Sequence, residues 1–411
     1  MQHSTLPISE TALKNTVVPP PAASRIASVD VYRGFVMLLM MAEILSFLKV
    51  AEALPGNAFW GFLSFQQSHV QWAWLALHDM IQPSFTFLVG VVLPYSIASR
   101  KSKGASFGNL IQHTIKRSFI LIFLGIFLRS IDDTQTYFTF EDTLSQIGLG
   151  YTFLVLLGFC SQRVQVIWLV VILVGYWLAF ALYPLPDNNF NYSAAGVTAD
   201  WQYNFHGFAA HWNKNTNLAW AFDKWFLNLF PRKNIFLNNE GGYSTLSFIP
   251  TLGTMIIGLL AGNMLHADRT QKAKLNFFIK MGTALILVGI LLHLSGINPI
   301  VKRIWTPAWT IFSSGICFLM LAFFYGVIDV AGKRKWSFFL MVIGANSIAA
   351  YVMADGGLRS FIHQSFYTHL GQNFDKIFGA PYAPLVSGGL TLLLLWIVLY
   401  WLYKKKIFIK I

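Results

Sequence analysis

The sequence is short of charged residues. Of its 411 residues, 11% are Asp, Glu, Lys or Arg and 55% are hydrophobic. Soluble globular domains carry roughly 25% charged residues, so this deficit excludes a soluble enzyme. A chain with 37 Phe, 14 Trp and 15 Tyr is typical of a protein whose outer surface contacts lipid. The composition therefore predicts an all-α fold, a polytopic bundle of transmembrane helices.

Cysteine is also scarce, and several catalytic motifs are missing. Cys160 and Cys317 are the two cysteines, and each lies within an apolar run, so neither a disulfide framework nor a cysteine metal site is indicated. The sequence lacks the HExxH, CxxC, P-loop and nucleophile-elbow patterns. We therefore expect no metal cofactor, no nucleoside triphosphatase and no serine hydrolase.

The two ends of the chain are predicted to be cytoplasmic tails. Residues 1–29 contain a Val-Val-Pro-Pro-Pro stretch and lack the apolar core of a signal peptide, which favours a disordered tail. Residues 404–411 form a short basic tail. Between them, residues 30–403 are expected to form one membrane domain.

Apolar runs long enough to cross a hydrocarbon core of about 30 Å recur along this domain. We predict ten spans, or eleven if the mildly apolar segment 356–378 also crosses. The ten runs are 31–53, 76–98, 117–131, 143–161, 164–185, 243–265, 274–296, 305–330, 336–354 and 384–403.

The net charge of +13 is interpreted from the positions of the basic residues relative to the predicted spans. With both termini inside, 18 Lys and Arg residues fall on the cytoplasmic side and nine on the opposite side. Basic residues accumulate on the cytoplasmic side of membrane proteins, so this bias favours cytoplasmic termini and an even number of spans. It also removes the reason to expect a nucleic-acid partner.

This topology places two segments, 54–75 and 186–242, on the outer face. The second is rich in Asn, Trp, Tyr, Phe and Gly and poor in aliphatic residues. Aromatic plates with amide groups suit a sugar-binding surface, because sugar C–H faces stack on rings while hydroxyls need hydrogen-bond partners. An aromatic belt at the membrane interface is the alternative interpretation.

Ionisable residues inside apolar runs are costly and are treated as functional candidates. Asp30 and Arg33 are three residues apart and predict an ion pair on one helix face. Glu43 lies deep in the first run with no base near it in sequence, so it needs a partner on another helix or a proton.

The densest cluster of such residues surrounds the start of the second run. His69 lies on the outer approach to it, and His78 and Asp79 lie just inside. His69 and Asp79 are ten residues apart and share a helix face only if the chain between them is irregular, as Pro83 suggests. A neutral imidazole here could act as a general base, with a buried carboxylate fixing its tautomer. A structural histidine and a proton relay in a transporter remain alternatives.

Several ordered motifs resemble a known family. They are RIASVDVYRGF at the first run, His69 with Asp79 and QPSFTFLVGVVLPYS at the second, DTLSQIGLGYTFLVLL at the fourth, EGGYSTLSFIPTLGTMIIGLLAG at the sixth, KRIWTPAWTIFSSGICF at the eighth and GANSIAAY at the ninth. Together they resemble the transmembrane N-acetyltransferases of the heparan-α-glucosaminide N-acetyltransferase type, and more closely a bacterial branch linked to N-acetylglucosamine and chitin utilisation. The resemblance covers nearly the whole chain after residue 25.

The resemblance implies a reaction in which acetyl-CoA on the cytosolic side acetylates the amine of a glucosamine on the other side. It implies that His69 and Asp79 are catalytic, and that Asn57 contacts the acetyl end. The large luminal domain of the animal enzymes has no counterpart, which favours a small amino sugar. The implied location is the inner membrane of a bacterium, and a homodimer is left open.

The remaining site assignments follow from this reaction. We expect His78, Glu43 and Asn346 to contact the sugar or the acetyl group, with Asn57 and Asn346 as oxyanion donors. CoA phosphates are expected near one of two groups of basic residues on the cytoplasmic side. One group is Lys333, Arg334 and Lys335, and the other is Arg100, Lys101, Lys103, Lys116 and Arg117. Each basic run is also explained by membrane topology alone.

Two rival functions remain open from sequence. One is a transporter of N-acetylglucosamine or its oligomers, with Glu43 and Asp79 as proton-coupling carboxylates. Many such transporters carry inverted repeats, and none is evident here. The other is O-acylation of a surface glycan, which uses the same chemistry on a different acceptor.

Overall fold

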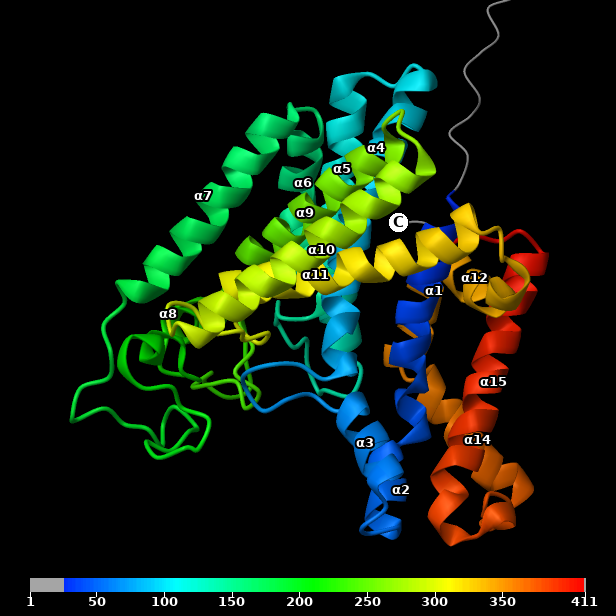
Figure 1. Ribbon diagram of the computed structural model, residues 1–411. Coiled ribbons are helices and arrows are strands. Elements are labelled where there is room, and N and C mark those ends of the chain that lie inside the picture. The colour runs from blue at the N-terminus through cyan, green and yellow to red at the C-terminus, as the bar shows by residue number, and fades with distance from the viewer. Residues whose placement is uncertain (1–25, 410–411) are drawn as a thin grey trace, which may run out of the picture.

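A computed structural model describes residues 26–409, and helices make up most of this part of the chain (Figure 1). The β pairing within residues 26–409 is an isolated antiparallel bridge between Ala73 and Val301. The predicted all-α class is therefore confirmed for this part. Most of the predicted tail 1–29 lies outside the described residues, and the first helix already begins at Ala27.

The helices follow one another with short connections, apart from the long segment between α7 and α9. Their bounds are α1 Ala27–Met41, α2 Phe47–Ala53, α3 Ala58–Gln67, α4 Ile81–Ser102, α5 Phe107–Arg129, α6 Thr143–Gly158, α7 Gln162–Ala181, α8 Leu218–Phe226, α9 Phe248–His266, α10 Gln271–Leu294, α11 Pro307–Phe324, α12 Phe338–Ala345, α13 Ser347–Asp355, α14 Leu358–Leu370 and α15 Ala383–Lys404.

Eight helical stretches within residues 26–409 are long and apolar enough to cross a membrane. All ten predicted runs form helices, but two of them fall short of this test. The run 143–161 forms α6, which has 16 residues, and the run 336–354 forms α12 and α13, which bend by 71° at their junction. The bent pair would bring the number to nine, so the predicted count of ten or eleven stays a prediction.

The third span is longer than its apolar run suggests. The sequence places it at 117–131, whereas α5 begins at Phe107, with the Ser106 hydroxyl accepting a hydrogen bond from the Asn109 N–H. The first turns of α5 contain polar residues that a hydropathy argument discards. They are helical because the cap satisfies the free N–H groups and the helix packs along α6.

The core of the bundle is the close packing of α4 against α9. A side chain added at Gly258 of α9 would place its Cβ 2.0 Å from the carbonyl oxygen of Phe87, and one at Gly90 of α4 would come equally close to Met255. Small residues let two helix backbones approach in this way. The helix that directly follows His78 and Asp79 is thus fixed at the centre of the molecule.

The outer helices present apolar side chains to the surroundings. Exposed Ile167, Trp168 and Val171 on α7, and Leu287 and Leu291 on α10, are examples. In water such surfaces would favour aggregation, whereas in a bilayer they contact lipid. The protein is a multi-pass membrane protein.

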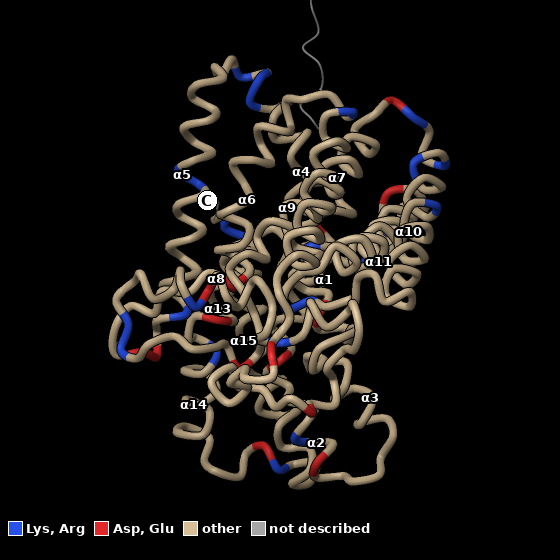
Figure 2. Tube along the Cα trace, turned by 90° about the vertical axis from the view of Figure 1, so that its left-hand side faces the viewer, with Lys and Arg blue, Asp and Glu red and all other residues tan. Residues whose placement is uncertain are grey.

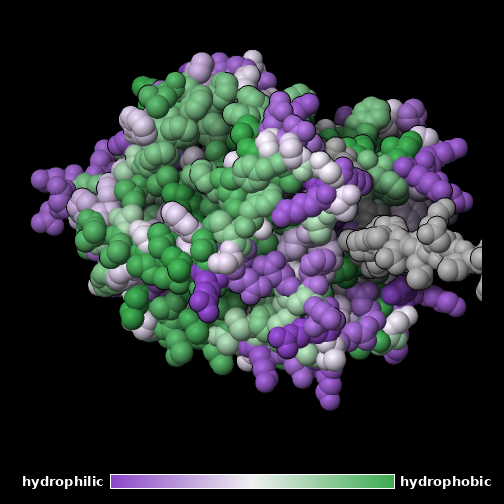
Figure 3. All heavy atoms as spheres, turned by 90° about the horizontal axis from the view of Figure 1, so that it is seen from above, coloured by the Kyte–Doolittle hydropathy of each residue, from purple (hydrophilic) through white to green (hydrophobic). Residues whose placement is uncertain are grey.

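The two ends of the bundle differ in charge and in structure. We call the end with the α4–α5 and α9–α10 connections the basic end, where Lys and Arg gather (Figure 2). Seen from above, hydrophilic residues run across this end between apolar flanks (Figure 3). The opposite end, which we call the loop end, carries the long segment 182–247 and the connections from α3 to α4 and from α10 to α11.

Candidate functional site

The candidate site lies at the loop end, where the chain between α3 and α4 is irregular. Residues 68–76 form no helix, and a 3₁₀ turn, η2 (Leu77–Met80), leads into α4. The Gln66 side-chain oxygen accepts a hydrogen bond from the Leu77 N–H at 2.9 Å, which closes the segment. The irregularity therefore precedes Leu77. Pro83, to which the sequence argument attributed it, lies in the first turn of α4, where proline is tolerated.

A second irregular segment, between α10 and α11, holds the first in place. The Trp74 N–H donates to the Ile300 carbonyl at 3.1 Å beside the Ala73–Val301 bridge. The Arg303 guanidinium donates to the Val70 carbonyl at 2.9 Å. The pairing is flanked by Trp74 at φ 73° and Trp305 at φ 48°, left-handed conformations that are unfavourable for bulky residues.

This pairing brings three ionisable side chains together. Nδ1 of His69 lies 2.7 Å from Oδ1 of Asp79. Nζ of Lys302 donates to the same oxygen at 3.0 Å and lies 3.3 Å from His69 Nδ1. Oδ2 of Asp79 accepts hydrogen bonds from the N–H groups of Val70 and Ala76 at 3.3 and 3.0 Å. Both carboxylate oxygens are thus fully engaged.

The three side chains differ in exposure. Asp79 is buried at 1% exposure and Lys302 at 5%, whereas 41% of the His69 side chain is exposed. When the imidazole is neutral with its proton on Nδ1, that N–H donates to Asp79 and Nε2 keeps its lone pair. The ring of His78 lies 4.9 Å from that of His69, measured between centroids. The arrangement offers an oriented, accessible base or nucleophile.

The other sequence candidates near this end, Glu43 and Asn57, are engaged with partners other than His69. Glu43 forms an ion pair with Arg359 of α14 at 3.1 Å, which supplies the partner that its position in the first run requires. Asn57 caps α3 by accepting hydrogen bonds from the N–H groups of Phe59 and Trp60. It lies at the far end of that ten-residue helix, about 15 Å along the axis.

Asn346 is not brought to His69 either. It lies at the junction of α12 and α13, where its side chain donates to the Ile407 carbonyl and accepts from the Ile409 N–H. Its amide is used to hold the chain after α15. The expected oxyanion roles of Asn57 and Asn346 therefore receive no support from their positions.

A cavity of about 480 Å³ follows α4 from Phe85, near its start, to Arg100 at the basic end. Its lining on α4 includes Phe85, Leu88, Val92 and Ser96, and ends at Arg100. These residues recur at three- and four-residue intervals and share one helix face. The cavity is largely apolar along its length, and three arginines contribute to its lining. They are Arg33 of α1, Arg100 of α4 and Arg117 of α5.

Arg117 is held in place while part of its guanidinium is left without a partner. Its Nη1 donates to the Tyr151 hydroxyl at 3.0 Å, and the guanidinium lies over the Tyr151 ring at 4.6 Å. Its Nε is buried and has no hydrogen-bond partner among the described residues. A buried donor without a partner is costly and suits an anionic ligand in this cavity.

The basic residues predicted to bind CoA divide into two groups. Arg100 and Arg117 line the cavity. Lys101, Lys103 and Lys116 are exposed and do not line it, and Lys101 lies over the Phe159 ring. Arg33 was expected as half of an ion pair and does lie 3.3 Å from Asp30, but it also faces the cavity.

The long segment of the loop end packs beside His69. Trp72 donates through its indole N–H to the Trp212 carbonyl at 3.1 Å. Arg303 donates to the Gly241 carbonyl at 2.7 Å, and its guanidinium lies over the Tyr243 ring at 5.0 Å. Arg303 therefore connects the His69 segment, through Val70, to the long segment 182–247 of the loop end.

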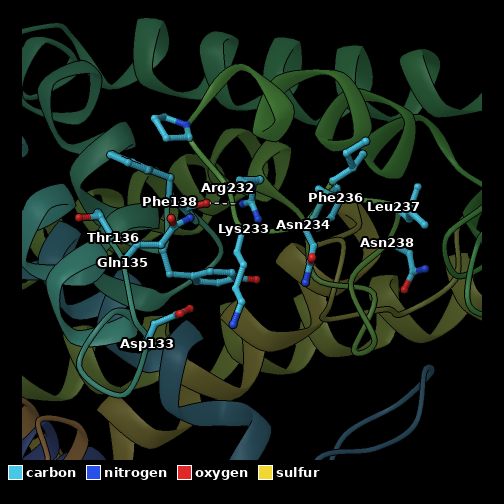
Figure 4. A pocket seen from close by; sticks show the side chains of 13 residues that line it. Asp133, Gln135, Thr136, Phe138, Arg232, Lys233, Asn234, Phe236, Leu237 and Asn238 are labelled. Carbon is cyan, nitrogen blue, oxygen red and sulfur yellow. Dashed lines mark hydrogen bonds between the residues drawn. The ribbon is translucent and has the colours of Figure 1, made fainter.

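A separate hollow of about 340 Å³ opens between residues 133–138 and 231–238 of the loop end. Figure 4 shows Arg232 reaching toward Phe138, to whose carbonyl it donates a hydrogen bond, with Lys233 and Asn234 beside it. His69, Asp79 and Lys302 are not part of its lining. Across residues 26–409, no cluster of three or more His, Cys, Asp or Glu side chains could hold a metal ion.

Lys302 is the site residue that the sequence argument missed. The topology count assigned it to the outer side as one of nine basic residues. A usable signal was present, because Lys302 lies in the apolar stretch Ile300 to Trp305, where an unpaired lysine is unfavourable. Its partner is 223 residues away in sequence, which no local pattern reveals.

Comparisons with known proteins agree with the sequence motifs. No family model matches the chain. It is 23% identical over 437 aligned residues to heparan-α-glucosaminide N-acetyltransferase of Homo sapiens, covering 96% of this chain. It is 25% identical to the Mus musculus protein of the same name, covering 95% of this chain. The chain spans 61% of the length of these relatives. This multi-pass membrane protein is thus similar, over nearly its whole described length, to two N-acetyltransferases.

Proposed function

We propose that this protein transfers the acetyl group of acetyl-CoA through the membrane to the amine of glucosamine or a small glucosamine-containing sugar. One observation carries the proposal. A single helix, α4, runs from an arginine-lined cavity at the basic end to the His69–Asp79–Lys302 cluster at the loop end. Asp79 and Arg100 are 21 residues apart, about 30 Å in a helix, which is the thickness of a hydrocarbon core.

The cavity fits the chemistry of CoA. Its phosphates would lie near Arg33, Arg100 and Arg117, because guanidinium groups bind phosphate with paired hydrogen bonds. The apolar face of α4 would then contact the pantetheine arm. This lining reaches Phe85, six residues from Asp79, so the thioester would approach the site from within the bundle.

His69 would then act on the acceptor. A glucosamine amine is largely protonated at neutral pH and must lose a proton before it attacks the thioester carbonyl carbon. The ammonium form first releases one proton to solvent, which gives the neutral amine. As this amine attacks and the C–N bond forms, His69 Nε2 takes a second proton from the nitrogen, and the C–S bond breaks. This second proton then passes to the departing CoA thiolate, which leaves as the thiol. Asp79 holds the imidazole with Nε2 available.

The acceptor is proposed from the surroundings of His69. Trp201 and Trp212 of the segment 186–242 contact Trp72, three residues after His69, and Arg303 joins this segment to the His69 segment. A small amino sugar needs such groups for stacking and hydrogen bonding. We propose further that the loop end faces the periplasm, the basic end the cytoplasm, and that the membrane is the inner membrane of a bacterium.

The test supplies purified protein with acetyl-CoA and glucosamine, and measures free CoA thiol and N-acetylglucosamine by mass spectrometry. Wild type is expected to form both in equal amounts, and a folded His69→Ala variant to lose at least about 100-fold in rate, the usual contribution of a general base. Wild type that forms no product, yet moves N-acetylglucosamine into liposomes, would replace this proposal with the transporter. Release of thiol with product found only on hydroxyl groups would indicate O-acylation.

A further inference from the structure

A buried cation lies in the site without a role in the transfer described above. Lys302 comes from the connection between α10 and α11, whereas His69 and Asp79 come from the connection between α3 and α4. It is 5% exposed, and its Nζ lies within 3.3 Å of both the Asp79 carboxylate and His69 Nδ1. Placing an ammonium group there requires a compensating gain.

The charge of Asp79 explains why a cation is needed. A buried carboxylate beside an imidazole favours the imidazolium, because an opposite charge within about 4 to 6 Å stabilises the charged form. An imidazolium has no lone pair at Nε2 and cannot accept a proton. Lys302 places a positive charge on the same carboxylate oxygen that His69 contacts, and so removes that bias.

The other charged groups around His69 are engaged elsewhere. Arg303, from the same connection as Lys302, donates to the carbonyls of Val70 and Gly241. Glu43 of the first span acts electrostatically on His78 of η2 and is paired with Arg359 of α14. Within residues 26–409, Lys302 is the cationic side chain that bonds directly to Asp79.

We infer that Lys302 is a positioning residue that neutralises Asp79, and thereby keeps His69 uncharged at neutral pH with Nε2 free to react. The role of the free Nε2 rests on the proposed function. The charge state of His69 itself does not, because it is a property of the resting protein. It can therefore be measured without any acetyl transfer.

The strained pairing of the α3–α4 and α10–α11 connections holds Lys302 beside Asp79. The bridge of Ala73 with Val301, and the bond from Trp74 to Ile300, fix the residue next to Lys302 against the His69 segment. Left-handed Trp74 and Trp305 persist only where the surrounding structure enforces them. The lysine is thus held at a fixed distance from the carboxylate.

The experiment measures the reaction of His69 with diethyl pyrocarbonate, which modifies uncharged imidazole, from pH 5 to pH 9. Chymotryptic cleavage after Trp72 or Trp74 separates His69 from His78, so that mass spectrometry quantifies each. The wild-type reactivity across this range is the reference profile. In Lys302→Met it should fall about tenfold at pH 7 and recover only at higher pH. Lys302→Arg should keep the wild-type profile, as should Lys233→Met, an exposed control at the loop end.

If Lys302→Met does not fold, a second pair of variants tests the same inference. Asp79→Asn and the double variant Lys302→Met/Asp79→Asn differ only in the lysine charge, and neither leaves a carboxylate unpaired. The double variant is expected to react at higher pH than Asp79→Asn. Identical profiles in this pair, or an unchanged profile in folded Lys302→Met, would overturn the inference. The expected profiles in the variants, with no acetyl transfer by wild type, would overturn the proposed function alone.

Discussion

At the scale of single residues, the site depends on one carboxylate that organises its neighbours. Asp79 accepts hydrogen bonds from two backbone N–H groups through Oδ2 and contacts His69 and Lys302 through Oδ1. The backbone bonds fix the orientation of the carboxylate, and the side-chain contacts fix the imidazole and its charge. A change at Asp79 is therefore expected to affect the rate more than the affinity.

Asp79→Asn tests this expectation. The amide cannot accept from His69 and Lys302 as a carboxylate does, and it can present an N–H to Nδ1, which selects the wrong tautomer. We expect kcat to fall by about 100-fold or more, with the KM for acetyl-CoA within about threefold of wild type. Steady-state kinetics check both values. A KM that rises while kcat is unchanged would contradict an orienting role.

The two neighbouring basic residues Lys116 and Arg117 form a matched pair. Both were expected from sequence to bind CoA, but only Arg117 lines the cavity. A charge-assisted hydrogen bond contributes about 1.5 to 3 kcal/mol, so Arg117→Gln should raise the Kd for CoA by roughly 10- to 100-fold. Lys116→Gln should leave it unchanged. Isothermal titration with CoA measures both, and equal effects at the two positions would contradict the assigned cavity.

At the scale of elements, the apolar runs locate the helices but not their interruptions. Each of the ten runs coincides with a helix because about 20 consecutive apolar residues leave few alternatives in a bilayer. The connection between α3 and α4 could be predicted as irregular only from the demand that His69 meet Asp79. Its pairing with the α10–α11 connection, and therefore Lys302, depends on tertiary contacts across more than 200 residues.

The contact between α4 and α9 gives a prediction at this scale. A Cβ at Gly258 would lie 2.0 Å from the Phe87 carbonyl oxygen, so Gly258→Ala must push the helices apart. Overpacking of this kind typically costs about 1 to 3 kcal/mol. We expect a lower melting temperature in detergent and weaker CoA binding. Gly175→Ala on α7, where a Cβ meets nothing within 4 Å, is the control and should match wild type in both.

The loop end carries a pH dependence of its own. Burial raises the pKa of Asp223 on α8 to about 7; one of its oxygens accepts from the Thr245 N–H, and the other has no partner among the described residues. Because the folded pKa lies above the unfolded value of about 4, the native state holds this proton where the unfolded chain does not. Stability from this group is present below pH 4 and is lost as the pH rises toward 7.

Asp223→Asn should remove this dependence. From pH 5 to pH 7, Asp223 accounts for a loss of up to about 3 kcal/mol in the wild-type free energy of unfolding, at 1.36 kcal/mol for each pH unit. Melting temperatures in detergent across this range should fall less steeply in the variant. A wild-type slope that Asp223→Asn leaves unaltered would show that the carboxyl is already ionised in the folded protein.

At the scale of the whole molecule, the helix α4 connects two ends with different chemistry, the basic end and the loop end. The sequence predicted the all-α class and the membrane location from composition, and it singled out His69, Asp79, Arg100 and Arg117 as candidates. It also proposed Asn57, Lys101, Lys103, Lys116 and Asn346, which neither line the cavity nor contact His69, Asp79 or Lys302. Spacing along the chain does not specify which face of a helix lines a cavity formed together with other helices. The candidates that lie at the cluster or the cavity therefore could not be distinguished from the others without the fold.

Transfer of acetyl groups across a sealed membrane distinguishes passage along α4 from a reaction on one side of the membrane. Protein is reconstituted into liposomes, acetyl-CoA with an isotopic label in its acetyl group is supplied outside, and glucosamine is enclosed. We expect labelled N-acetylglucosamine inside the liposomes, dependent on His69, and free CoA thiol outside. Product that forms only when both substrates share one compartment would contradict transfer along α4 from the basic end to the loop end.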